Sequence, residues 1–270
     1  MTDHDIFSGR LLVGCAGWSL PKAEDTQDFP ATGSHLERYA AVFPAVEINS
    51  SFYRPHRPAT YAKWADSVPE HFRFAVKVPR AITHDARMEN VEQQLVQFAS
   101  EAGELGDKLG ALLVQLPPKF GFVDETAREF FRQVHAIFGR TIAFEARHPS
   151  WFAEAATDLL RESRVTRVVA DPAAGQPGPH VPTSTDAVYV RLHGTPRIYY
   201  SRYAPEYIES VRRLLARQAA AGRSCWCIFD NTASGEATAN ALELLNGLAG
   251  QQLDEEAIAA HAPFARGCGE

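Results

Sequence analysis

Eight short apolar runs alternate with segments of helical period along this 270-residue chain. Such alternation is typical of repeated strand–helix units around a parallel sheet. The runs cover residues 11–17, 45–52, 73–78, 111–116, 141–147, 166–171, 187–194 and 225–231. The helical segments cover residues 35–43, 60–67, 91–105, 125–138, 154–164, 205–221 and 237–248. The order of these elements predicts one large α/β domain.

The segment between the sixth and seventh runs breaks this pattern. Residues 172–186 contain four prolines and have no helical period, so we expect a loop in place of the sixth helix. Eight strands with one missing helix fit a (β/α)₈ TIM-type barrel better than a doubly wound sheet, which normally carries a glycine-rich nucleotide turn. We therefore predict a single barrel domain over residues 1–250. We expect residues 251–270 to form a partly disordered tail.

Charge and hydropathy limit the classes of partner. The net charge of −6 argues against a surface that follows the phosphates of a long duplex. No run reaches the roughly 18 uninterrupted apolar residues of a membrane span, and the amino terminus lacks a basic region followed by an apolar core. We therefore expect a cytoplasmic protein that does not bind a membrane.

Charged and amide side chains recur inside the predicted strands. Alternate side chains of a barrel strand face the helices and the interior. Apolar residues such as Val46, Phe144 and Val190 occupy the helix-facing positions, so the polar residues face inward near the carboxyl ends, where barrel enzymes build their sites. The inward set is Glu47, Asn49, Ser51, Lys77, Gln115, Glu145, Arg147, Tyr189, Arg191 and His193, extended by Asp171, Asp230 and Asn231 at the ends of two further strands and by Trp18 as an apolar wall.

Two interpretations of the inward charges are open. The charges can neutralise one another as a structural network, or they can form a ligand site. Replacing buried ion pairs by apolar residues is often neutral or stabilising, so stability alone is a poor reason for so many. Clusters of perturbed charges also tend to mark functional sites. We favour the ligand site, and we expect Arg191 to bind an anionic group of the ligand rather than to stabilise the scaffold.

Seven sequence blocks carry a family resemblance. CAGWS, EINSSFY, KVPRAITH, LLVQLPP, FEARHPSW, RLHG and FDNTASGEATANA occur in this order between residues 11 and 248, and they resemble the signature blocks of the domain of unknown function 72 family (YecE-like). The resemblance implies a TIM-type barrel, sometimes compared with endonuclease IV, and brings no established reaction. Glu145, Arg147 and His148 keep the common fifth-strand pattern. Asp230 with Asn231 departs from the more common Asn-Asn pair of the eighth strand.

The motifs argue against a resident metal or an organic cofactor. Glu47, Glu145 and His193 offer ligand types of hydrolytic metal centres, but the three cations expected among them would repel a divalent ion. The sequence has no HxH, HExxH or CxxC spacing. It also lacks a GxSxG elbow, a phosphate loop and a dinucleotide fingerprint. We expect neither a metal nor a cofactor.

The cations predict an anion pocket. Two guanidinium groups and one ammonium can hold a phosphate or a carboxylate, and His84, His148 and His193 can transfer protons near neutral pH. Glu47 and Glu145 form a second candidate acid–base pair. We predict Glu145, His193 and Glu47 as catalytic residues. The predicted substrate-binding residues are Asn49, Lys77, Gln115, Arg147, His148, Asp171, Arg191, Asp230, Asn231 and Trp18.

Two functions follow from this set. The first is an enzyme, a hydrolase or a lyase-like catalyst, that acts on a small anionic or nucleotide-like substrate at the mouth of the barrel. The second is a nucleic-acid-binding module without catalysis, related to endonuclease IV-like barrels. Residues 197–203 (RIYYSRY) favour the second, because aromatic rings interleaved with cations can stack on bases and bind phosphates.

Overall fold

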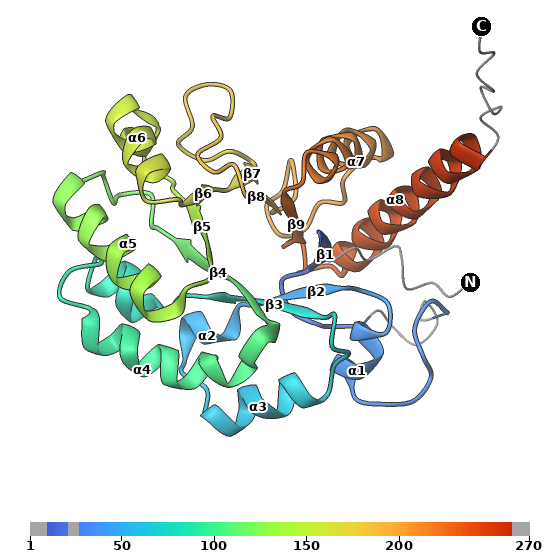
Figure 1. Ribbon diagram of the computed structural model, residues 1–270, viewed down its shortest axis with the longest axis horizontal. Helices are drawn as coiled ribbons and strands as arrows, with labels where there is room; N and C mark the ends of the chain where they lie inside the picture. The colour runs from blue at the N-terminus through green and yellow to red at the C-terminus, as the bar shows by residue number, and fades with distance from the viewer. Residues whose placement is uncertain (1–9, 21–26, 261–270) are drawn as a thin grey trace, which may run out of the picture.

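The computed structural model describes residues 10–20 and 27–260. Within them, nine strands form two parallel sheets (Figure 1). The strands are β1 (Leu11–Cys15), β2 (Ala45–Ile48), β3 (Arg73–Lys77), β4 (Leu109–Gln115), β5 (Thr141–Glu145), β6 (Thr166–Arg167), β7 (Val169–Asp171), β8 (Ala187–Leu192) and β9 (Ser224–Phe229). The strand order is β1-β9-β8-β7 in one sheet and β2-β3-β4-β5-β6 in the other. The predicted parallel α/β fold is therefore confirmed.

Helices lie around the outside of the strands (Figure 1). They are α1 (His35–Ala40), α2 (Ser50–Tyr53), α3 (Pro58–Asp66), the π-helix η2 (Ala81–Asp85), α4 (Glu92–Ala102), η3 (Gly103–Lys108), α5 (Asp124–Phe138), η4 (Pro149–Phe152), α6 (Glu154–Glu162), α7 (Pro205–Ala220) and α8 (Glu236–Ala260). Residues 172–186 form turns and bends without a helix, as their prolines predict. None of the described helices is long and apolar enough to span a membrane.

The two sheets meet at two places without forming one closed ladder of eight strands among the described residues. On one side, a single parallel bridge joins Ala16 to Glu47. On the other, the predicted sixth strand divides at Val168, so that β6 pairs with β5 and β7 pairs with β8. The division has a local cause, because the backbone N–H of Arg167 donates to Thr183 Oγ1 (2.8 Å) instead of to a strand.

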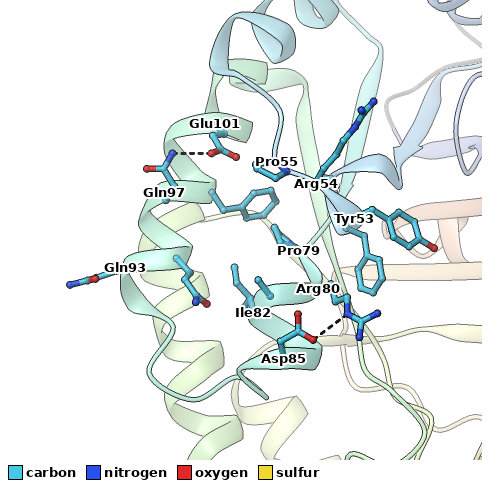
Figure 2. Close-up of a pocket in the computed structure, with 15 residues that line it drawn as sticks. Tyr53, Arg54, Pro55, Pro79, Arg80, Ile82, Asp85, Gln93, Gln97 and Glu101 are labelled. Atoms are coloured by element: carbon cyan, nitrogen blue, oxygen red, sulfur yellow. Dashed lines mark hydrogen bonds and ion pairs between the residues drawn. The ribbon is translucent and has the colours of Figure 1, made fainter.

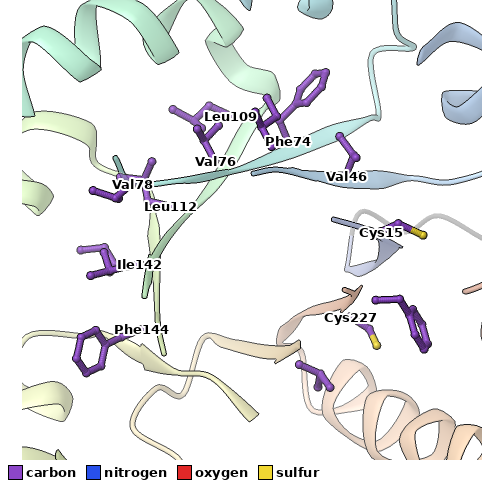
Figure 3. Close-up of a cluster of buried hydrophobic side chains, with 14 of the residues drawn as sticks. Cys15, Val46, Phe74, Val76, Val78, Leu109, Leu112, Ile142, Phe144 and Cys227 are labelled. Carbon is purple, nitrogen blue, oxygen red and sulfur yellow. The ribbon is translucent and has the colours of Figure 1, made fainter. Parts of the chain in front are cut away.

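Side chains alternate between two apolar clusters as predicted. Positions such as Val46, Phe74 and Phe144 lie in the large outer cluster against the helices (Figure 3). The inner cluster is small and consists of Leu12, Ala45, Ala75, Ala111, Leu113, Ala143, Val168, Tyr189, Trp226 and Ile228. Its alanines leave room for the rings of Tyr189 and Trp226, which stack with centroids 5.7 Å apart. This aromatic pair fills the interior below the polar residues.

Some helix ends agree with the sequence and others do not. Ser34 begins α1 with a capping box, and Gly139 ends α5 with φ of 57°. Asp124 is the first residue of α5 and pairs with Arg128. Helix α8 continues to residue 260, past the predicted end at 248 and into the predicted tail; residues 261–270 lie outside the described part. The short helices α2 and η2 were not predicted.

We predict that Gly110→Ala destabilises the fold by about 1–3 kcal/mol, the usual cost of inserting a methyl group into a packed core. A Cβ at this position would lie 2.6 Å from Cζ2 of Trp226. Trp226→Phe removes that ring atom, so the double variant should lose less stability than the sum of the two single variants. Urea denaturation measures all three. Gly103→Ala, where a Cβ meets nothing within 4 Å, is the control, and additive effects would contradict the prediction.

Candidate functional site

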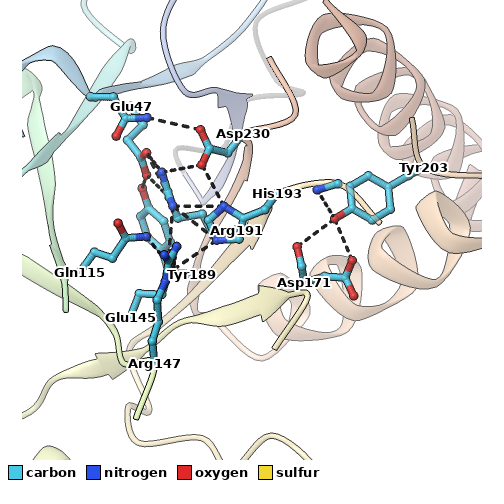
Figure 4. A network of polar contacts seen from close by, with 12 residues as sticks. Glu47, Gln115, Glu145, Arg147, Asp171, Tyr189, Arg191, His193, Tyr203 and Asp230 are labelled. Carbon is cyan, nitrogen blue, oxygen red and sulfur yellow. Dashed lines mark hydrogen bonds and ion pairs between the residues drawn. The ribbon is translucent and has the colours of Figure 1, made fainter. Parts of the chain in front are cut away.

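A buried arginine joins the carboxyl ends of strands from both sheets (Figure 4). Arg191 comes from β8, and its side chain is 1% exposed. Its guanidinium lies 2.7 Å from Glu47, 3.1 Å from Glu145 and 3.1 Å from Asp230. Burial opposes the charge on Arg191, but the three carboxylates outweigh it and hold the pKa well above its usual value. Arg191 is therefore the common partner of the polar cluster.

Glu47 is the completely buried carboxylate of this cluster. Its two oxygens accept from Nε and Nη2 of Arg191, and Oε2 also accepts from the Tyr189 hydroxyl at 2.8 Å. These contacts correct two expectations. Glu47 was predicted to be catalytic and Arg191 to bind ligand, but each is enclosed and bound to the other, so the geometry favours a structural role for both.

His193 connects two of the carboxylates. Its Nδ1 lies 2.9 Å from Asp230 Oδ2, and its Nε2 lies 3.2 Å from Glu145 Oε1. Burial lowers the pKa of the ring, but the hydrogen bonds to Asp230 and Glu145 more than offset it, so the net pKa is raised. A protonated ring can donate to both carboxylates at once. His193 is therefore the titratable link between Glu145 and Asp230.

Glu145 receives donors from several directions. Its Oε1 accepts from Gln115 Nε2 at 2.7 Å and from Arg147 Nη2 at 2.9 Å, and its Oε2 accepts from Arg191. Burial raises the pKa of Glu145, but the charge of Arg191 and the hydrogen bond to His193 outweigh it and lower the pKa well below the usual value. Glu145 is therefore ionised at neutral pH. Gln115 faces the interior, as the strand period predicts, and its contact with Glu145 was not predicted.

A cavity of about 290 Å³ opens beside this carboxylate. Glu145, Arg147 and His193 line it, together with Pro172 and Tyr199 from the loops that follow β7 and β8. The Tyr199 ring meets His193 edge to face, with centroids 6.1 Å apart. The cavity thus brings together two of the three residues predicted to be catalytic with one of the predicted substrate-binding residues.

Lys77 differs from the other cations of the cluster. It ends β3, and it is 7% exposed. In the described part of the chain, no carboxylate lies within 4.0 Å of its Nζ, which instead lies 4.2 Å from the centre of the Phe52 ring. Burial, with a further contribution from the positive charge of Arg191, lowers the pKa of Lys77 to about 8. Among the cations of the cluster, Lys77 is the one that has no carboxylate of the described residues within 4.0 Å.

His84 also contacts the Phe52 ring. It belongs to the π-helix η2, and its ring meets Phe52 edge to face at 4.9 Å. Nδ1 pairs with Thr83 Oγ1 at 2.9 Å. Burial and the neighbouring charge of Lys77 lower its pKa, so the ring is neutral at pH 7. The sequence indicated His84 only as one of three histidines that can transfer protons. The π-helix that positions it was not predicted from the hydrophobic period.

Two predicted site residues lie apart from the cluster. The Asp171 carboxylate accepts hydrogen bonds from the Tyr203 hydroxyl at 2.8 Å and from Thr195 Oγ1 at 2.6 Å, and not from the residues around Arg191 (Figure 4). Asn231 donates to the carbonyl of Ser201 and to Asn240 on α8. The parity of the strand explains Asn231, since it follows Asp230 and therefore points to the opposite face.

Other predicted residues have local partners. Trp18 packs edge to face against Trp64 of α3, with centroids 5.0 Å apart. His148 caps η4, where its Nδ1 accepts from the backbone N–H of Ser150. Ser51 is not on a strand but in α2, where its hydroxyl donates to the carbonyl of Lys77 at 2.7 Å. These positions correct the expectation that all the residues surround one ligand.

Asn49 stays near the cluster. Its amide nitrogen lies 3.5 Å from Asp230 Oδ1, and its buried Oδ1 has no partner in the described part of the molecule. No group of three His, Cys, Asp or Glu side chains that could hold a metal ion occurs among the described residues. The expectation of no resident metal remains a prediction.

We predict that Arg191→Met lowers the free energy of unfolding by about 3–5 kcal/mol, because breaking one side of a buried ion pair leaves uncompensated charge. Arg147→Met is the control, since the Arg147 side chain is 23% exposed and forms an ion pair only with Glu145; its loss should be smaller. Denaturation in guanidinium chloride at pH 7 measures both. An Arg191→Met variant as stable as the parent would restore the ligand-binding role for this arginine.

Known proteins resemble this chain in sequence. The UPF0759 protein YecE of Escherichia coli K12 is 27% identical over 176 residues, which are 60% of this chain and 59% of YecE, so this match spans less than two thirds of YecE. The UPF0759 protein YunF of Bacillus subtilis is 27% identical over 282 residues, and the match covers 90% of this chain and 99% of YunF.

Solved structures resemble its fold. A DUF72 family protein from Enterococcus faecalis V583 superposes with a TM-score of 0.74 at 23% identity, covering 88% of this chain and 95% of the other. SacUVDE superposes with a TM-score of 0.54 at 9% identity, covering 90% of this chain and 99% of the other. The family described as "Protein of unknown function DUF72" matches residues 12–263, which confirms the resemblance found in the sequence blocks. This chain belongs to the DUF72 family.

Proposed function

We propose that this protein is an enzyme, a hydrolase or a lyase-like catalyst, that binds a small anionic substrate at the carboxyl ends of the strands. The observation that carries the proposal is Lys77, a buried cation without a carboxylate within 4.0 Å in the described part of the chain. Burying an uncompensated charge costs free energy unless something pairs with it. A phosphate or carboxylate group of a substrate is the partner that we propose.

The charges of the cluster support this assignment. Three carboxylates, those of Glu47, Glu145 and Asp230, have two close arginine partners, Arg191 and Arg147, and His193 adds a third positive charge when it is protonated. Lys77 is a further cation. With His193 protonated, one negative group bound beside Lys77 completes the charge balance, whereas a divalent cation worsens it.

Two histidines with pKa values shifted in opposite directions supply an acid and a base. The pKa of His193 is raised and the pKa of His84 is lowered, so His193 keeps its proton to higher pH than His84 does. Environments that separate the pKa values of two titratable groups commonly mark acid–base assignments. We assign His193 as the general acid and His84 as the general base. Glu145 orients His193 through their hydrogen bond, and both residues line the cavity of about 290 Å³.

We further propose that the two sheets are the halves of a TIM-type barrel. The bridge between Ala16 and Glu47 and the short interval at Val168 bring the sheet edges together on both sides. In such barrels the loops after the strands carry the chemistry, in keeping with a site built from the ends of β3, β5 and β8.

We predict that inorganic phosphate raises the melting temperature at pH 7, relative to chloride at equal ionic strength, because a ligand that binds the folded state stabilises it. Lys77→Gln should remove this effect. The stabilisation should also decline as pH rises past 8, because the pKa of Lys77 is about 8 and the neutral amine no longer attracts an anion. Differential scanning calorimetry at pH 7 and pH 9 measures both effects.

Lys63→Gln is the matched control, since Lys63 is exposed on α3 and should leave the response unchanged. Phosphate gains negative charge over the same pH range, so a weaker response at pH 9 reports a change in the protein. An undiminished response in Lys77→Gln, or no response in the parent protein, would refute the anion site.

A second candidate function is binding of single-stranded nucleic acid at the rim. The side chains of Ile198, Tyr199 and Tyr200 are exposed, and Arg197 stacks 3.9 Å from the centre of the Tyr200 ring. Exposed aromatic rings beside cations suit base stacking. The net charge of −6 weighs against it.

If the rim binds nucleic acid, a fluorescent single-stranded oligonucleotide should bind more tightly than the duplex, and the affinity should fall steeply between low and moderate salt because phosphate contacts release counterions. Tyr200→Ser should weaken binding several-fold, since stacking contributes about 1–3 kcal/mol per base. Tyr207→Ser, on α7, is the control. Fluorescence anisotropy measures the affinity, and absence of binding at low salt would eliminate this candidate.

A further inference from the structure

A second cavity lies outside the strand ends, between α4 and the segments around α2 and η2 (Figure 2). Its volume is about 410 Å³, within the range of small-molecule pockets. Phe52, Pro55, Pro79, Ile82 and Phe98 give it a mainly apolar lining. Glutamines of α4 and the carboxyl group of Glu101 supply its polar edge. The apolar walls predict an apolar body for any occupant.

Glu101 gives the cavity its chemical character. This residue is 8% exposed, and its Oε1 accepts one hydrogen bond, from Gln97 Nε2 at 2.9 Å (Figure 2). Among the described residues, no lysine, arginine or histidine nitrogen lies within 4.0 Å of its oxygens. A neutral amide only partly offsets the cost of burying a carboxylate. Glu101 is therefore a buried carboxyl group that no cationic side chain of the described residues contacts at ion-pair distance.

The other charged residues of the lining do not supply that partner. Arg80 pairs with Asp85 at 3.1 Å, at the opposite end of the cavity. The guanidinium of Arg54 points away from the cavity in Figure 2. The end of the cavity at Glu101 consequently keeps its negative charge uncompensated, and the opposite end is close to neutral.

We propose that this cavity is a binding site for a small organic cation, a primary amine on an aromatic or aliphatic body. The ammonium group donates to Glu101 and the carbonyl oxygen of the Gln97 amide, and the body fills the space between Pro79, Ile82 and Phe98. The Phe98 ring, which also lines the cavity, can add cation–π attraction to the ammonium. The site is distinct from the anion site at Lys77, since it selects the opposite charge and lies on the outer side of Phe52.

The test uses benzylamine as the probe and benzyl alcohol as its neutral counterpart of nearly equal size. Binding to the full-length protein is measured at pH 7 by ligand-observed saturation-transfer NMR with titration. We expect benzylamine to bind at least tenfold more tightly than benzyl alcohol. Glu101→Gln should abolish this preference, because an amide holds no charge. Glu92→Gln, on the exposed side of the same helix, should preserve it.

A second variant tests the location of the site. Gln94 lines the cavity from an exposed position on α4, so Gln94→Trp should block binding of both probes while Glu101 is retained. Far-UV circular dichroism and the melting temperature check that each variant is folded. Equal affinities of the two probes in the parent protein, or a preference that survives in Glu101→Gln, would overturn the proposal. Binding unchanged in Gln94→Trp would do the same.

Discussion

The pairing of Arg191 with three carboxylates is the constraint on which the interior depends. A guanidinium that is 1% exposed is stable only if its charge is matched and its donors are used. Glu47 approaches it from β2, Asp230 from the end of β9 and Glu145 from the end of β5. The two sheets therefore share one electrostatic centre. Below it, the apolar stack of Tyr189 and Trp226 occupies space that small alanines leave open.

This centre also sets the properties of the groups around it. His193 lies between two carboxylates, which raise its pKa, whereas Lys77 lies beyond their hydrogen-bonding reach and has its pKa lowered mainly by burial and by the charge of Arg191. The same network thus raises the pKa of one base and leaves another with a lowered pKa. Residues that appear equivalent in the sequence therefore have different partners in the structure.

The period of two in the strands was enough to predict which side chains face inward. It placed Lys77, Gln115 and Arg191 correctly, because alternate positions on a strand cannot share a face. It could not predict the partners, since pairing of Arg191 with Glu47 depends on contacts across more than 140 positions of the chain. It also missed η2 and the division at Val168, where local hydrogen bonds interrupt the regular period. His84 was consequently placed by the structure alone.

Phe52 contacts both the outer cavity and the residues at the carboxyl ends of the strands. Its ring borders the outer cavity, and it also contacts Lys77 at 4.2 Å and His84 at 4.9 Å. A packed ring cannot change position for one neighbour without changing the contacts of the others. Thermodynamic linkage is reciprocal. If a ligand in the outer cavity changes the affinity for a ligand at the strand ends by some factor, the second ligand changes the affinity for the first by the same factor. If both proposed sites bind their ligands, this single phenyl group is the contact through which one ligand can alter the affinity for the other.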